Sequence, residues 1–392
     1  MKKFWALLLS VVFVFSFGCG GGTPSDKDPD VDPKPIEVDY GNVENVKNII
    51  LLIGDGMGVD QIKAGNLFCE NGLYLDGMPN KILTETASLA SDETEIATDS
   101  AAAGTALATG VRTDNGLVGL SPEREQLTTI VDIAKGLCKS TGIITTEKLC
   151  GATPMAFSAH GNRDDYQDLV NSAALSGNVD LYIAEDDAAD TVNYSIFTSS
   201  LAGYTAINNV DDISETSLST KIFGLYPISA DAESMTDYSF DRLVSESLEY
   251  LSKNENGFFL MAEGAHIDHG GHSNSVERML DELLAFDLGV KVALEWAKNR
   301  NDTIVIVTAD HETGGFVLGD KATKDNLFDE DEYGNAINYN WLTKTHTGAD
   351  VNLYIYGMKI DYTKYSTSES ANKIRNADVF TIMNSFFPQV IS

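Results

Sequence analysis

The six histidines of this 392-residue chain are concentrated in a few short segments that also contain carboxylates or an arginine. Two segments are especially dense in them: Glu263-Gly-Ala-His-Ile-Asp-His-Gly-Gly-His272 and Thr308-Ala-Asp-His-Glu-Thr-Gly-Gly315. Imidazole together with carboxylate is the ligand set that borderline divalent metals such as zinc prefer. The sequence therefore predicts a metal-centred active site.

Five residues are candidate zinc ligands. Asp268 and His272 are four positions apart, so on a helix both can face one ion, although a polar loop with a satisfied histidine explains the pair equally well. The adjacent Asp310 and His311 can both reach a metal if they lie in a turn. His346 is alone in its segment, where a histidine is more often structural. Together they supply enough ligands for two zinc sites with open positions.

A second group of candidates offers only oxygen atoms: Asp55 in Gly54-Asp-Gly-Met-Gly58, Thr153 and Glu263. Hard oxygen ligands suit magnesium. The glycines around Asp55 could suggest a nucleotide-binding loop, but that pattern is weak and the embedded aspartate is unlike a dinucleotide loop. A tight turn around a metal explains them better.

Ser100 precedes a run of small residues, 101–109, that reads as a helix. A serine at a helix start most simply caps the helix. The same position also offers an anion free N–H groups and the positive end of the helix dipole, so Ser100 is a candidate nucleophile toward phosphate. It lacks a Gly-x-Ser-x-Gly setting, which favours activation by a metal over a lipase-like elbow.

The elements that must position these residues form an α/β pattern. Continuous apolar runs predict strands buried on both faces of a parallel sheet at 48–53, 141–145, 257–262 and 303–308. Amphipathic stretches predict helices at 127–139, 240–253 and 275–298. We therefore predict a three-layer sandwich, with a largely parallel central sheet covered by helices on both faces. Asp55, Glu263 and Asp310 follow predicted strands, at the edge where such sheets bind ligands.

The N-terminal part has the features of an export signal. Residues 1–18 combine two lysines with a short apolar run, followed by Cys19, and predict a signal peptide of the lipoprotein type with Cys19 lipidated. An ordinary secretory signal cut near Gly18 or a retained anchor are the alternatives. Residues 19–45 predict a disordered tether, and 46–392 a catalytic domain with 178–240 as surface elaboration. We expect an exported protein of the periplasm or cell envelope, anchored by lipid.

The formal net charge is −32, which disfavours a nucleic-acid-binding surface. A site for anions in such a chain must create positive potential locally, and divalent cations can do so. Three cysteines lie beyond the leader, and in an oxidising compartment one pair could form a disulfide, but the sequence does not choose which: Cys69, Cys138 and Cys150.

From residue 46 to 387 the chain resembles the alkaline phosphatases. The resemblance rests on six motifs in order: Asp55-Gly-Met-Gly58, Thr98-Asp-Ser-Ala-Ala102, Ala152-Thr-Pro154, the two histidine segments above, and His346-Thr-Gly348. It implies hydrolysis of small phosphate monoesters through a phosphoserine on Ser100. It also implies one zinc on Asp268, His272 and His346, a second zinc on Asp55, Asp310 and His311, and magnesium on Asp55, Thr153 and Glu263. Arg163 would bind the phosphate.

Two departures from the family pattern bear on these expectations. The family usually carries Asp or His where Gly151 stands, near the magnesium shell, which puts the metal preference of that site in question. The interval from Thr153 to Arg163 is one residue shorter than usual, so a surface role for Arg163 stays open. The remaining histidines, His160, His266 and His269, are expected to support the motifs rather than bind metal.

Other activities remain to be weighed. A sulfatase needs a Pro and Arg pattern that is absent after Ser100, whereas a phosphodiesterase is harder to exclude because its specificity lies in loops. A surface lipoprotein that binds phosphate or metal without turnover is the alternative outside enzymes. The sequence does not fix the oligomeric state, for which a homodimer is one candidate.

Overall fold

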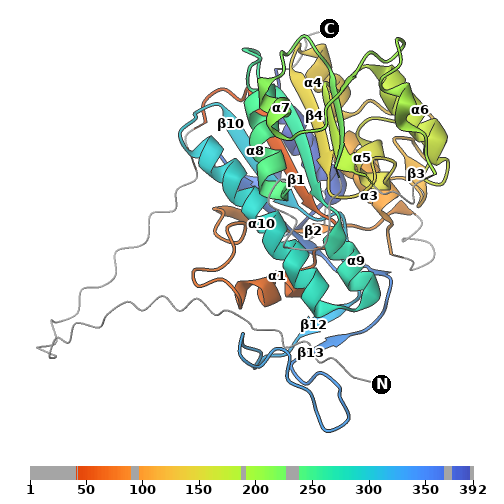
Figure 1. Ribbon diagram of the computed structural model, residues 1–392. Helices are drawn as coiled ribbons and strands as arrows, with labels where there is room; N and C mark the ends of the chain where they lie inside the picture. The colour runs from red at the N-terminus through yellow and green to blue at the C-terminus, as the bar shows by residue number, and fades with distance from the viewer. Residues whose placement is uncertain are drawn as a thin grey trace, which may run out of the picture. The chain divides into compact units, whose positions relative to one another are not determined.

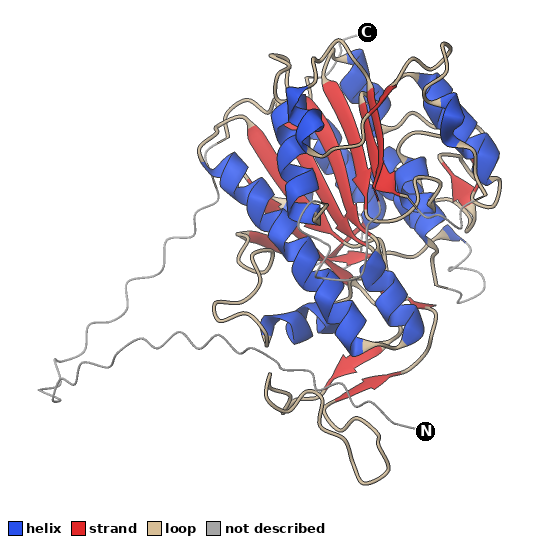
Figure 2. Cartoon of the chain, in the orientation of Figure 1, coloured by secondary structure: helices blue, strands red, loops and turns tan. Residues whose placement is uncertain are grey.

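One long sheet organises the folded part of the chain (Figures 1 and 2). The computed structural model describes residues 41, 43–89, 97–186, 191–226, 238–365 and 373–388. The sheet has ten strands, in the order β16 (Lys373–Arg375), β2 (Asn80–Glu85), β15 (Val351–Tyr356), β10 (Thr303–Thr308), β1 (Asn48–Gly54), β9 (Phe258–Gly264), β4 (Ser140–Thr145), β6 (Leu181–Glu185), β8 (Ile222–Tyr226) and β7 (Thr205–Ala206). Strand β15 is antiparallel to both neighbours, and the other pairings are parallel.

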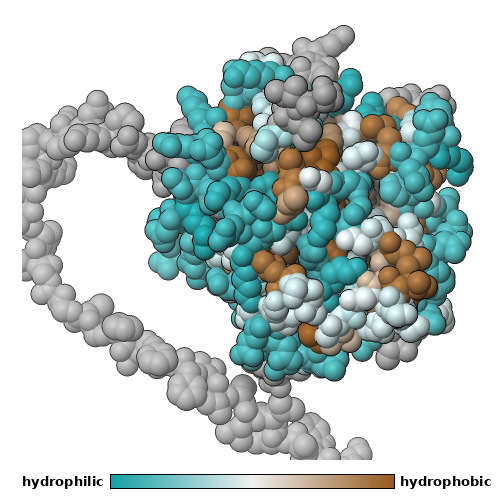
Figure 3. All heavy atoms as spheres, turned by 90° about the horizontal axis from the view of Figure 1, so that it is seen from above, coloured by the Kyte–Doolittle hydropathy of each residue, from teal (hydrophilic) through white to brown (hydrophobic). Residues whose placement is uncertain are grey.

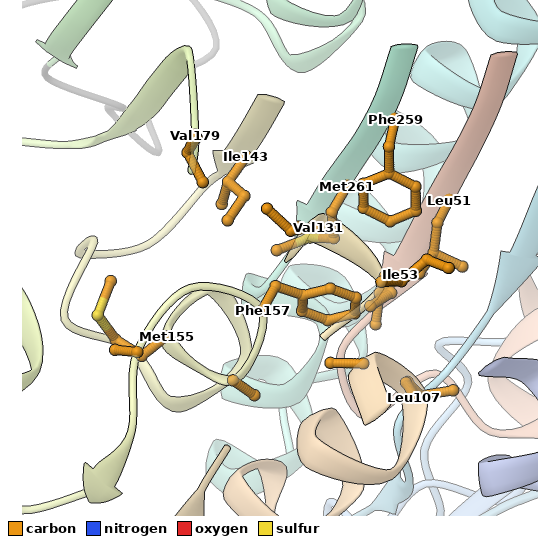
Figure 4. Packing of buried hydrophobic residues seen from close by; sticks show 14 of the residues in the cluster. Leu51, Ile53, Leu107, Val131, Ile143, Met155, Phe157, Val179, Phe259 and Met261 are labelled. Carbon is orange, nitrogen blue, oxygen red and sulfur yellow. The ribbon is translucent and has the colours of Figure 1, made fainter. Parts of the chain in front are cut away.

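Helices cover both faces of this sheet (Figure 2). Alternate residues of β1 belong to two separate hydrophobic clusters: Ile49, Leu51 and Ile53 to one, Ile50 and Leu52 to the other. The first cluster, drawn in Figure 4, joins α3 (Ser100–Thr109), α4 (Ile130–Gly136), α5 (Ala152–Ala156), α6 (Tyr166–Ser176) and α11 (Asn376–Phe386). The second joins α1 (Val59–Asn66), α7 (Asp211–Glu215), α8 (Phe240–Leu251), α9 (His266–Ser273) and α10 (Val276–Lys298). The predicted three-layer α/β sandwich is confirmed.

The described residues of the segment 178–240 contribute strands to the central sheet. The segment was expected to be surface elaboration, and its described residues include β6, β7 and β8, which extend the sheet to its edge. Their apolar runs are short, and Gly224 interrupts the one in β8. Runs of this length do not stand out from loop sequence until a neighbouring strand pairs with them.

The surface fits the acidic composition of the chain. Seen from above, it is mostly hydrophilic, with hydrophobic residues in scattered patches (Figure 3).

Among the described residues, none of the helices is both long and apolar enough to cross a membrane. The expected signal peptide, Cys19 and most of the tether lie outside the described residues. Cys69 and Cys138 carry free thiols.

Asp287 of α10 connects this helix to the loop between α1 and β2. Its carboxylate accepts the backbone N–H groups of Tyr74 and Leu75, at 2.8 and 2.9 Å. Asp287 is 3% exposed and Leu75 is fully buried, so no bulk water can replace the lost acceptor. We predict that Asp287→Ala lowers the free energy of unfolding by about 1–3 kcal/mol, measured by chemical denaturation.

The matched control is Asp281→Ala on the same helix, where the aspartate is exposed. Its free energy of unfolding should stay within about 0.5 kcal/mol of the parent. Equal stability of Asp287→Ala and the parent would show that the carboxylate does not hold the loop.

Candidate active site and metal centre

The candidate ligands meet because three central strands are in register at their carboxyl ends. Ile53 of β1 pairs with Glu263 of β9 on one side and with Thr308 of β10 on the other. The next turns therefore bring Asp55 and Asp310 alongside Glu263. Gly56 has a φ of +71°, and a Cβ there would lie 2.8 Å from the Cα of Asp268, so the turn after β1 can approach α9 only with glycine.

Asp55, Asp310 and His311 form the first cluster. Their ligand atoms lie within 4.8 Å of one another. His311 Nε2 is 3.1 Å from Asp310 Oδ2 and 3.6 Å from Asp55 Oδ1. The other oxygen of Asp310 accepts the backbone N–H groups of Gly56 and His311, which fixes the carboxylate.

Asp268, His272 and His346 form the second cluster. Helix α9 places Asp268 and His272 on one face, with His272 Nε2 3.2 Å from Asp268 Oδ2. His346 begins β14 (His346–Thr347), which pairs with β11 (Glu312–Thr313), and its Nε2 lies 3.2 Å from that of His272. His346 and Asp268 also fall within 4.8 Å of His311, so the two clusters are contiguous.

The tautomers of the three histidines show that this arrangement fits cations. The Nδ1 atoms of His272 and His346 face the backbone carbonyls of Lys344 and Thr98, which can only accept. When these rings are neutral, the Nδ1 atoms therefore carry the protons, and the unprotonated Nε2 atoms point at each other and at Asp268. Facing lone pairs and carboxylate oxygens would repel, and a divalent cation between them turns this repulsion into coordination.

Thr313 sets the third tautomer, and the sequence analysis had not singled it out. Its hydroxyl donates to Asp268 Oδ1 at 2.5 Å, so it can only accept from His311 Nδ1, 3.3 Å away. This leaves His311 Nε2 unprotonated toward Asp55 and Asp310. One threonine thus orients a residue of each cluster. It lies inside the Thr308–Gly315 motif, which was the available signal.

The oxygen-only candidates Asp55, Thr153 and Glu263 are all buried. Among the buried side-chain atoms that have no hydrogen-bond partner within the described residues are four oxygens of candidate ligands: Asp55 Oδ1, Thr153 Oγ1, Glu263 Oε1 and Asp310 Oδ2. The second oxygen of Glu263 accepts from Thr145 at 2.5 Å. Buried oxygens left without donors are the expected partners of a hard cation such as magnesium.

Burial and charge crowding shift the titration of these groups. Burial, reinforced by neighbouring carboxylates, raises the pKa of Asp55 and Glu263 well above the usual range and that of Asp310 to about 7. Hydrogen bonding to Asp268 raises the pKa of His272 to about 9. Without a cation the site takes up protons, so metal binding must displace them and should strengthen as pH rises.

Ser100 lies between these clusters at the first turn of α3. The capping explanation is wrong, because the cap is Asp99, whose carboxylate accepts the backbone N–H of Ala102 at 2.9 Å. The Ser100 hydroxyl instead lies 3.2 Å from His311 Nε2. Every residue of α3 is buried, which explains its run of alanine and glycine, and Gly110 ends it in the left-handed conformation.

Arg163 is brought to the same place by Asp99. It follows the short strand β5 (Gly161–Asn162), and its Nη1 lies 2.9 Å from Asp99 Oδ2. Asp99 therefore holds both the helix that begins with Ser100 and the guanidinium. This contact places the guanidinium beside the residue that precedes Ser100.

The other histidines lie around the clusters. His160 bonds the carbonyl of Leu127 at 2.9 Å. His266 lies between Glu185 and Glu282, and its ring stacks on that of His269. Neither candidate metal cluster includes them.

The comparisons with known proteins agree with this geometry. A family model described as alkaline phosphatase matches residues 46–192 and 201–324. The chain belongs to the alkaline phosphatase family. Alkaline phosphatase 4 of Bacillus subtilis is 33% identical over 305 residues, which cover 71% of this chain and 64% of that protein. The alkaline phosphatase of Escherichia coli K12 is 28% identical over 384 residues, covering 79% and 81%.

The fold of this alkaline phosphatase family member also matches solved structures. The alkaline phosphatase from the Antarctic bacterium TAB5 is 26% identical, with a TM-score of 0.72, covering 88% of this chain and 98% of that one. This chain spans less than two thirds of the length of the Bacillus relative.

Thr313→Val tests the tautomer argument. The substitution keeps the shape but removes the hydroxyl that orients Asp268 and His311. We predict that zinc affinity, measured by competition with a chromogenic chelator, falls by about 10–100-fold. Thr343→Val, at a partly exposed threonine in the loop before β14, should leave the affinity unchanged. Equal zinc affinity in all three proteins would show that the hydroxyl does not orient the ligands.

Proposed function

We propose that this protein hydrolyses phosphate monoesters to an alcohol and inorganic phosphate through a covalent phosphoserine on Ser100. One observation carries the proposal: the Ser100 hydroxyl lies 3.2 Å from His311 Nε2, and His311 belongs to the first candidate metal cluster and lies within 4.8 Å of Asp268 and His346 of the second. A nucleophilic oxygen beside converging metal ligands is the arrangement needed for attack on phosphorus. The relatives reported above are alkaline phosphatases, which supports this activity.

The proposed metals are two zinc ions and one magnesium ion. Asp268, His272 and His346 would hold one zinc, and Asp55, Asp310 and His311 the other. Magnesium would bind Asp55, Thr153 and Glu263, whose oxygens lack other partners within the described residues. A mutant of the TAB5 enzyme is known with Mg bound in its M3 site, which supports magnesium. When bound, the cations would lower the pKa of the Ser100 hydroxyl and balance charge on the phosphoryl oxygens.

The chain's own groups then define the reaction path. Ser100 Oγ attacks phosphorus as the bond to the alcohol oxygen breaks, and water later cleaves the phosphoserine to release phosphate. The N–H groups of Ala102 and Ala103 bond Asp99, so the start of α3 would act on the anion mainly through the positive end of the helix dipole. Arg163, held by Asp99, would bind two phosphate oxygens through its planar guanidinium. A strongly acidic protein can in this way offer an anion a cationic pocket.

We also propose that the protein is exported and held at the cell envelope by a lipid on Cys19. The support is the sequence of the leader and of the Gly- and Pro-rich tether. A homodimer is the oligomeric state we propose for test.

Ser100→Ala is the direct test of the nucleophile. With a chromogenic monoester at alkaline pH, the metal-replete parent should show turnover that a chelator abolishes and zinc restores. Ser100→Ala should lose about three orders of magnitude or more of kcat while its zinc content is unchanged. Absence of chelator-sensitive turnover in the parent contradicts the proposal, and faster cleavage of the matching diester assigns a phosphodiesterase instead.

Arg163→Ala tests phosphate binding. Loss of a charge-assisted bidentate contact should raise KM, and the inhibition constant of inorganic phosphate, by about 10–100-fold. Arg163→Lys keeps the charge without the bidentate geometry. Its KM and phosphate inhibition constant should therefore lie between those of the parent and those of Arg163→Ala. Arg300→Ala is the control, because that guanidinium stacks on Trp296 beyond the end of α10. Unchanged KM and phosphate inhibition in Arg163→Ala would return Arg163 to a structural role.

A further inference from the structure

The space beside Gly151 is occupied by the side chain of another residue. Gly151 precedes α5 with φ −54° and ψ 151°, a conformation open to any residue. A Cβ at this position would nevertheless lie 1.8 Å from Glu147 Oε1 and 2.7 Å from Glu147 Cδ. The backbone does not require glycine here. The carboxylate of Glu147 occupies the volume into which a side chain from residue 151 would extend.

This volume adjoins the candidate magnesium site from two directions. Gly151 is two residues before Thr153, whose hydroxyl is buried without a hydrogen-bond partner. Glu147 donates its backbone N–H to Thr145 Oγ1, and Thr145 in turn donates to Glu263 Oε2. Thr146 donates its backbone N–H to the carbonyl of Glu263. The turn that carries Glu147 is thus bonded directly to one proposed magnesium ligand and lies next to another.

The outward side of Glu147 meets solvent and the phosphate-binding residue. Glu147 and Arg163 line one cavity of about 290 Å³, together with Gly151 and Tyr166. Glu147 Oε2 lies 4.0 Å from His269 Nε2, and the Glu147 side chain is 23% exposed. The carboxylate therefore stands between the buried oxygen ligands and water, where it can accept hydrogen bonds from water molecules on an ion.

We propose that Glu147 is the outer carboxylate of the Asp55, Thr153 and Glu263 site, where it takes the place of a side chain at position 151 and orients the waters of a bound magnesium ion. Glu147 is a positioning residue, and the inference rests on the magnesium site of the proposed function. Magnesium is bound through few protein ligands and keeps several waters in strict octahedral geometry. Acceptors that fix those waters favour magnesium over zinc, which prefers four ligands.

The geometry also means that position 147 or position 151 can supply a carboxylate to the same volume. One carboxylate fits in the shared volume, and it can arrive from either position. Gly151→Asp alone places two carboxylates in one space, whereas Glu147→Ala combined with Gly151→Asp offers one again.

The experiment measures magnesium binding to the zinc-loaded protein by calorimetry and by metal content after dialysis, independently of turnover. Glu147→Ala should bind magnesium about 10–100-fold more weakly and retain extra zinc in its place. Glu147→Ala with Gly151→Asp should regain most of the magnesium affinity, and Gly151→Asp alone should not reach the parent value. Glu282→Ala is the control. Glu282 contacts His266 Nδ1 rather than a proposed magnesium ligand, so this substitution should leave magnesium binding unchanged.

Several outcomes would overturn the inference. One is a Glu147→Ala protein that binds magnesium like the parent. Another is a double variant that binds as weakly as Glu147→Ala, which would make Glu147 a structural ion-pair residue. If Glu147→Ala does not fold, Glu147→Gln decides, because it keeps the volume and should weaken magnesium binding without changing the thermal midpoint of the metal-free protein. Repeating the titrations in Ser100→Ala separates this inference from the activity, since magnesium binding there must follow the same order.

Discussion

The register of β1 with β9 and β10 imposes the constraint on which the site depends. It buries Asp55, Glu263 and Asp310 at one edge of the sheet, where like charges out of water repel one another. The fold tolerates this only if protons or cations are taken up. Divalent cations do so while leaving coordination positions open, and thus convert a destabilising cluster into a binding site for an anion.

Two residues that are not candidate ligands hold the side chains of the site in position through hydrogen bonds. Asp99 caps α3 and also holds Arg163 and the backbone of Gly116, so one carboxylate fixes the helix of Ser100 and the guanidinium together. Thr313 orients Asp268 and His311 through one hydroxyl. Its neighbour Glu312 accepts from Thr347 and Gln61, which ties the His346 segment to α1. The ligands are therefore positioned by hydrogen bonds from segments far apart in the chain.

The contact between Glu147 and position 151 illustrates why a residue type at a single position can mislead. From the sequence alone, the glycine at position 151 only put the metal preference of the site in question. In the fold, the volume beside Gly151 contains the carboxylate of Glu147, four residues earlier in the chain. What matters to a metal is which atoms surround it, and the backbone offers more than one route for delivering them.

The sequence by itself determined the class of fold, the central strands and the residues offered as ligands, because apolar periodicity and the pairing of imidazole with carboxylate are local properties. It did not find β6, β7 and β8, whose short runs become strands only through their neighbours. The tertiary structure alone decided that Asp99, not Ser100, caps α3 and which histidine nitrogens carry protons. It alone decided too that Glu147 fills the space of residue 151. These depend on distances between segments that are far apart along the chain or turn back on themselves, which local sequence patterns do not encode.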